Sequence, residues 1–179
     1  MNTFLELSKS RRSIRSYEKR EIKQTELEKC AEAARYAPSA CNTQPWKFII
    51  VNTVPVRKKI AEEAFSSFNS FAKEAAAYII IVSEKTNFSA WLGEKLRSTD
   101  FRLMDIGSAA SHIALQAQEL GIGSCILGWF DEKKIKKILK VPFSKKIELV
   151  IALGYQKNTS ETPPKKLKDA SDAVSFNRY

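Results

Sequence analysis

An uninterrupted run of apolar residues near the middle of the chain, Tyr78–Val82, constrains the fold more than any other feature. Consecutive apolar positions, most of them β-branched, are typical of a strand that is covered on both faces. The run is too short to cross a bilayer, so it fits the core of a globular protein. A strand of this kind needs a layer of other elements on each side of its sheet.

The remaining hydrophobic periodicity predicts the elements that would form these layers. Helical spacing occurs over 3–9, 24–37, 55–65, 67–76, 101–120 and 131–139, and strand patterns occur over 46–51, 124–127 and 147–153, whereas 88–97 is ambiguous. Strands and helices alternate, but at long and uneven intervals. This pattern favours an α+β fold over a regular doubly wound sheet.

Several residues mark where the predicted helices begin and end. The longest helix, 101–120, is lined with small residues that would let another helix approach closely, and Gly121 would end it. The helix over 24–37 would begin at Thr25, with Glu28 three residues later completing a capping box. The helix over 131–139 would have Asp131 as its N-cap.

The length and charge of the chain limit its organisation. The 179 residues include 30 Lys+Arg against 20 Asp+Glu, a net charge of +10. This length suits one compact domain, which we expect over 1–155, followed by a polar extension over 156–179. The extension cannot pack on itself, so it either frays or lies against something else, such as a second subunit.

Much of the positive charge lies in and after the segment DEKKIKKIL at 131–139. Ile135, Ile138 and Leu139 recur there at helical spacing, so the lysines among them, Lys136 included, are expected on the solvent face. No zinc finger, RNP aromatic pair or helix-turn-helix spacing accompanies these lysines. A solvated helix face is therefore the preferred interpretation, with steering of an anionic substrate and nucleic-acid binding as alternatives.

The cysteines and the histidine narrow the possible chemistry. Cys30, Cys41 and Cys125 are scattered without a CxxC pair, and His112 is the only histidine. These counts fit reduced thiols, and they argue against a zinc site and against a Ser-His-Asp triad. With no recognisable signal peptide or membrane span, we expect a cytoplasmic protein whose reactive group comes from a cofactor.

Three motifs carry residues suited to binding a ligand. Arg11, Arg12, Ser13 and Arg15 follow the first helix, and arginine side chains match phosphate or carboxylate groups bidentately. The loop PSACNTQPWKF, starting at residue 38, places hydroxyl and amide groups between prolines, a polar edge that could read a heterocycle. In GIGSCILGWFD, starting at residue 121, Gly128 could present its backbone N–H beside a planar ligand.

Together these motifs resemble the nitroreductase family of flavin-dependent oxidoreductases. RRSIR, PSACNTQPWKF and DIGSAASHIALQAQELGIGSCILGWFD occur in the family's order and are followed by LVIALGY and the tail KKLKDASDAVSFNRY. The resemblance implies an α+β fold with a mainly antiparallel central sheet flanked by helices. It also implies an intertwined homodimer with two FMN sites at the subunit interface, in which the tail embraces the partner.

The resemblance assigns a role to each matching residue. The phosphate and ribityl end of FMN would be held by Arg11, Arg12 and Ser13, with Lys166 and Lys168 of the tail. Arg15 would reach the pyrimidine edge of the flavin. The partner subunit would contribute a loop containing Pro38, Ser39, Ala40 and Asn42, supported by Gln44. The backbone that contacts flavin N5 would be that of Leu127 and Gly128.

The function that the resemblance implies is a ping-pong hydride transfer from NAD(P)H through flavin N5 to an electron-poor acceptor, such as a nitroaromatic or a quinone. No side chain is assigned a catalytic role and no metal is implied. A specialised family reaction, reductive dehalogenation or oxidative ring modification, is an alternative, as is a non-catalytic flavin-binding protein.

Departures from the family pattern are visible, among them Gly128, where some larger relatives have Glu. Leu167 stands between the tail lysines where many relatives have arginine. The positions of a ring-contacting Asn and Lys in some relatives fall on Phe68 and Phe71, or on Asn69 and Lys73 after a small shift, so these contacts stay unassigned.

Overall fold

The centre of the molecule is a four-stranded antiparallel sheet. The computed structural model describes residues 3–85, 99–157 and 165–179. The strands lie in the order β1-β2-β4-β3, with bounds β1 (Trp46–Val51), β2 (Ala77–Ser83), β3 (Gly123–Leu127) and β4 (Lys146–Gly154). The predicted α+β class and antiparallel sheet are confirmed. The ambiguous stretch 88–97 lies outside the described residues.

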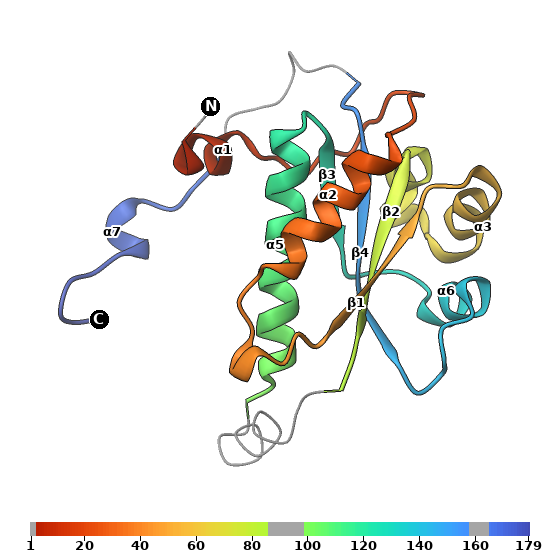
Figure 1. Ribbon diagram of the computed structural model, residues 1–179. Helices are drawn as coiled ribbons and strands as arrows, with labels where there is room; N and C mark the ends of the chain where they lie inside the picture. Colours follow the sequence, from red (N-terminus) through yellow and green to blue (C-terminus); the bar gives the residue numbers. More distant parts are fainter. Residues whose placement is uncertain (1–2, 86–98, 158–164) are drawn as a thin grey trace.

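Helices cover both faces of the sheet and flank its ends (Figure 1). They are α1 (Phe4–Ser10), α2 (Gln24–Arg35), η1 (Ala40–Asn42), α3 (Val54–Ala64), η2 (Ser67–Glu74), α5 (Phe101–Glu119), α6 (Glu132–Leu139) and α7 (Ala170–Ala173). The stretch 67–76 therefore contains a 3₁₀ helix rather than an α-helix. Helices α2 and α5 lie on one side of the sheet, and α3 and α6 lie on the other (Figure 1).

Strand β2 is buried along its whole length, as its unbroken apolar sequence predicts. Tyr78, Ile80 and Val82 enter the core shared with α3 and α6, whereas Ile79 and Ile81 enter the core shared with α2 and α5. The two sets alternate because successive side chains of a strand point to opposite faces. Strand β2 therefore packs against both helical layers, one on each face of the sheet.

The helix termini follow the predicted chemistry in part. Asp131 caps α6 by accepting a hydrogen bond from the Lys134 N–H at 3.0 Å, as expected. At α2 the expected box of Thr25 and Glu28 is wrong, because the Lys23 N–H donates to Glu26 instead, at 3.1 Å. The helix begins one residue before Thr25, which leaves that side chain inside the first turn.

The prediction that Lys136 lies on the solvent face of α6 is wrong. It is only 8% exposed, and its ammonium group lies 2.7 Å from the Glu132 carboxylate one turn earlier. It also donates to the Phe143 carbonyl at 3.4 Å. Lys136 follows Ile135 directly in sequence, and these partners allow its charge to be buried at the edge of the apolar stripe.

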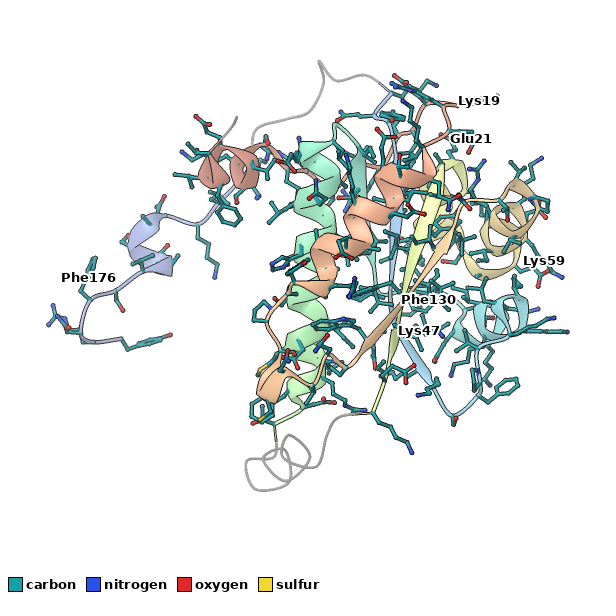
Figure 2. The ribbon with its side chains drawn as sticks, viewed as in Figure 1. Lys19, Glu21, Lys47, Lys59, Phe130 and Phe176 are labelled. Carbon is teal, nitrogen blue, oxygen red and sulfur yellow. The ribbon has the colours of Figure 1, made fainter. Side chains whose placement is uncertain are left out.

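The described tail, 165–179, is exposed throughout and contains only the short α7. In Figure 1 it runs away from the sheet, and Phe176, 84% exposed, projects from it (Figure 2). No helix among the described residues is long and apolar enough to cross a membrane.

Two glycines let the segment after α1 dock against the sheet. A Cβ atom on Gly123 would lie 2.7 Å from Ile14 Cγ1, and one on Gly154 would lie 2.6 Å from Tyr17 Cδ1. Both distances are shorter than real Cβ contacts. Ile14 and Tyr17 can therefore sit in the core only because these strand positions carry no side chain.

This close approach predicts the effect of adding one methyl group. Gly123→Ala should destabilise the protein by about 1–3 kcal/mol, because Ile14 must shift out of a packed core. Gly107 in α5 is the matched control, since a Cβ there meets nothing within 4 Å. Gly107→Ala should raise stability by up to about 1 kcal/mol through helix propensity. The midpoints of urea unfolding measure both, and an unchanged midpoint for Gly123→Ala would contradict the packing argument.

Candidate functional site

Residues 11–15, called the arginine segment below, lie along the edge of β3 that faces away from β4. Ser13 forms a parallel bridge with Ser124, and the Ile14 N–H donates to the Ser124 carbonyl at 2.9 Å. Ile14 points into the core, which leaves Ser13 and Arg15 exposed. The segment thus holds polar and cationic side chains at the surface beside an edge strand.

Arg12 carries a hydrogen-bond donor with no partner among the described residues. Its Nη1 donates to the carbonyls of Lys9 and Arg11, while its buried Nε makes no hydrogen bond. Leaving a buried donor unpaired costs roughly 1–3 kcal/mol. The chain itself covers this Nε, whereas the side chain as a whole is partly exposed, so a phosphate oxygen would meet the guanidinium at its accessible atoms.

The positive charges of Arg11 and Arg15 affect the pKa of a thiol on the neighbouring strand. Burial raises the pKa of the Cys125 thiol in β3, and the nearby Arg15 and Arg11 partly oppose that rise in pKa. Two guanidinium groups therefore lie near one position of β3. This positive field favours an anion at the edge of the sheet.

The end of β3 meets the η2 helix. Leu127 is buried, Gly128 is exposed, and a Cβ on Gly128 would meet nothing within 4 Å. The Asn69 amide of η2 donates to the Trp129 carbonyl, and the Arg15 guanidinium lies 5.7 Å from the centre of the Phe71 ring. These contacts bring the arginine segment, η2 and the turn at Gly128 together.

The proline-bounded loop 38–45 is a second, separate part of the candidate site. Cys41, Asn42 and Gln44 adopt positive φ values of 50°, 53° and 48°. Such conformations are uncommon for residues other than glycine and cost of order 1–3 kcal/mol each, so they tend to cluster at functional sites. The backbone N–H of Gln44 donates to the Ser39 hydroxyl at 3.0 Å, which helps to hold the loop in this shape.

Asp105 anchors this loop, and sequence reasoning missed it. Both of its carboxylate oxygens lie 3.1 Å from the Ala40 nitrogen, which donates to them. Burial raises the pKa of Asp105, while the hydrogen bond from Ala40 lowers it. The available signal was a carboxylate on the apolar face of α5, directly before Ile106 and four residues before Ala109.

One chain brings only some of the predicted residues together. Arg11, Arg12, Ser13, Arg15, Leu127 and Gly128 gather at the β3 edge of the sheet. Pro38, Ser39, Ala40, Asn42 and Gln44 lie before β1, at the opposite edge, next to the start of α5 (Figure 1). Lys166 and Lys168 lie in the exposed tail.

The chemistry that these groups offer is binding and orientation. Cationic groups, hydroxyls and amides predominate, and the described residues include no group of three His, Cys, Asp or Glu side chains able to hold a metal ion. His112 lies away from both parts, with its Nδ1 2.9 Å from the Ser108 carbonyl within α5. The arrangement is suited to a phosphate-bearing ligand with a flat polar ring.

Comparisons with known proteins agree on one family. The model of the nitroreductase family matches residues 8–155. The oxygen-insensitive NADPH nitroreductase of Helicobacter pylori strain J99 is 33% identical, with 87% of each chain covered. A nitroreductase family protein from Clostridium novyi NT superposes with a TM-score of 0.76 at 30% identity, covering 90% of this chain and 89% of that one. An FMN-dependent nitroreductase from Clostridium difficile R20291 gives 0.76 at 29% identity, covering 98% and 100%.

The anchor at Asp105 generates a prediction about the loop. Asp105→Leu removes the acceptor of the Ala40 N–H, so hydrogen exchange at Ala40 should become roughly ten- to a hundredfold faster, as loss of a bond to a charged group predicts. Asp105→Asn keeps one acceptor oxygen and should retain part of the protection. Glu119→Gln, at the other end of the same helix, is the control. Equal exchange at Ala40 in all variants would show that Asp105 does not hold the loop.

Proposed function

The chain belongs to the nitroreductase family, and we propose that it is an FMN-dependent oxidoreductase that uses NAD(P)H to reduce an electron-poor acceptor, such as a nitroaromatic or a quinone. The observation that carries the proposal is the cluster of cationic side chains on the segment 11–15, which is fixed to the edge of β3. The relatives include a protein named as an NADPH nitroreductase and another named as an FMN-dependent nitroreductase, and both names support the same assignment.

The residues at the β3 edge fit the phosphate of FMN. Arg12 offers a partly exposed guanidinium, Arg11 adds charge and the exposed Ser13 adds a hydroxyl, and all three share one short segment. Ile14 holds that segment in place through its buried side chain and its bond to Ser124. Little conformational freedom is lost when a ligand binds to such a fixed segment, which favours affinity.

Other residues of the chain would orient the flavin ring. Arg15, packed over Phe71, would hold a positive charge toward the pyrimidine edge. Leu127 and Gly128 would direct backbone groups toward N5, with no Gly128 side chain to obstruct the ring. FMN, when bound, supplies the two-electron redox chemistry that these side chains lack. We assign no proton donor among the side chains.

We infer that the reductant and the acceptor use the same face of the site in turn. A ping-pong order of this kind needs only one ligand-binding face per site. The exposed Gly128 and the exposed aromatic side chains of Trp129 and Phe68 leave an open surface next to the turn. Planar molecules, including a nicotinamide and an aromatic acceptor, suit such a surface.

A homodimer would complete the site. The loop 38–44 and the segment 11–15 lie at opposite edges of one sheet, so a single chain cannot place both against one ligand. Apolar side chains that a partner could cover are exposed in the same chain, including Phe4, Leu103, Met104 and Phe176. The partner's loop would then face this chain's arginines, and the extension 156–179, with Lys166 and Lys168, would lie across the partner.

Two alternatives use the same binding site. A non-catalytic flavin-binding protein would bind FMN without turnover, and a specialised family reaction would use a different acceptor. Nucleic-acid binding rests on the positive charge alone, and the clustered lysines of α6 are partly committed to the fold, as Lys136 shows.

The phosphate assignment predicts a selective loss of cofactor affinity. Arg12→Gln should raise the dissociation constant for FMN by about ten- to a hundredfold, because it removes a charged donor. Arg35→Gln is the control, since Arg35 is exposed and paired with Glu32 on α2. Flavin fluorescence titration measures both constants. Equal affinities would show that Arg12 does not contact the phosphate.

Activity is tested with the FMN-loaded protein, NADH or NADPH, and nitrofurazone or menadione as acceptor. We expect oxidation of the nicotinamide to depend on the acceptor. Tight FMN binding without oxidation with any acceptor would reject the reaction and leave the non-catalytic alternative. Absence of FMN binding would reject both.

Complementation tests whether the site is shared between two chains. The variants Arg12→Gln and Ser39→Ala/Asn42→Ala should each be weakly active alone. When the two are co-expressed, mixed dimers contain one site with no substituted residue, so about a quarter of all sites should recover. Purified mixed dimers with no recovered activity would contradict a site built from two subunits.

A further inference from the structure

A hollow at the surface near the start of α3 lies outside the residues assigned to the flavin. It encloses about 780 Å³ and is lined by the segment 17–21, the start of α3, the end of η2 and Lys157. Figure 2 shows Lys19 and Glu21 on the same side of the molecule as α3, away from α1. Its volume falls within the range of about 300–1,000 Å³ that is typical of small-molecule sites.

The hollow carries a surplus of positive charge. Its lining contains six cationic side chains and three acidic ones. Glu21 is neutralised within the fold, because both of its oxygens accept hydrogen bonds from Arg57 at 2.7 and 2.8 Å, and this contact lowers the pKa of Glu21. Arg57 also donates to the Ala76 carbonyl, so its guanidinium is fixed in the wall.

Most of the remaining cations are available to a ligand. Lys19, Lys58, Lys73 and Lys157 are exposed, and none of them forms an ion pair with a side chain of the described residues. Arg20 is held differently, with its guanidinium 3.7 Å from the centre of the Tyr155 ring. Ammonium groups from separate segments therefore surround one space, with Glu18 and Glu74 as the remaining acids.

We propose that this hollow binds a nucleoside diphosphate unit, with the two phosphates among the lysine ammonium groups and the nucleoside along the aliphatic parts of the lysine side chains, above a floor formed by the buried Tyr17, Ala75 and Ala76. Lysine is a common binder of phosphate as a point charge. A single phosphate would leave most of the space unfilled, whereas a nucleoside diphosphate is larger and carries enough negative charge to contact several of the lysines. The unit could be a free nucleotide or the corresponding half of the dinucleotide reductant.

The binding test needs neither FMN nor turnover, so it is independent of the proposed reaction. ADP is titrated into the full-length protein at low ionic strength by calorimetry, and adenosine is the probe without phosphates. The wild type should bind ADP saturably and adenosine not at all. Lys19→Gln/Lys58→Gln should weaken ADP binding by about tenfold or more, the effect expected for lost charged contacts.

A charge-matched control separates a site from general attraction. Lys133→Gln/Lys134→Gln removes the same charge from exposed positions of α6, outside the hollow, and should leave the affinity for ADP within about twofold of wild type. Absence of saturable ADP binding would overturn the proposal. Equal weakening by both double variants would also overturn it.

The source of the nucleotide is identified by kinetics with the FMN-loaded protein. If ADP competes with NADPH, and Lys19→Gln/Lys58→Gln raises KM for NADPH without lowering kcat, the hollow holds part of the reductant. If ADP binds and neither parameter changes in the variant, the hollow holds a separate nucleotide.

Discussion

The complete burial of β2 on both faces is the constraint on which the rest of the structure depends. Its side chains alternate between two cores, so neither helical layer can be removed without exposing half of the strand. Because helices cover both faces of the sheet, a ligand can approach it only at its edges and at the ends of its strands. Both parts of the candidate site lie there, one beside β3 and the other before β1.

The arginine segment lies at the surface but is held in place by side chains that pack in the core. Ile14 and Tyr17 enter the core at positions where β3 and β4 carry glycine, and the residues between and before them are left at the surface. Affinity for an anion therefore depends on apolar packing behind the arginines as well as on their charge. The same segment continues into 17–21, so it connects the β3 edge, where we propose the FMN phosphate binds, to the hollow near α3.

Most of what the sequence predicts correctly depends on neighbouring residues along the chain, although the capping box expected at Thr25 and Glu28 is also local and is wrong. The periodicity of 101–120, the apolar run at 78–82 and the cap at Asp131 were read correctly, because each is set by local spacing. Asp105 was missed because its partner, Ala40, lies 65 residues away. Lys136 was placed wrongly because periodicity does not show that Glu132 and the Phe143 carbonyl compensate its burial. The hollow near α3 could not be predicted from the sequence, because its lysines come from segments that only the fold brings together.

The position of the arginine segment has a further consequence for the exposed edge of the sheet. Among the residues that the structure describes, β3 has a strand neighbour only on its β4 side, so its other edge would offer unpaired backbone groups to a second chain. The bond from Ile14 to Ser124 occupies part of that edge, and the arginines place charge beside it. Charged residues are a common means of preventing edge-to-edge aggregation. Any change that lifts this segment would therefore expose the strand edge and promote aggregation, and under the proposed function it would weaken FMN binding at the same time, so solubility and cofactor affinity would be linked.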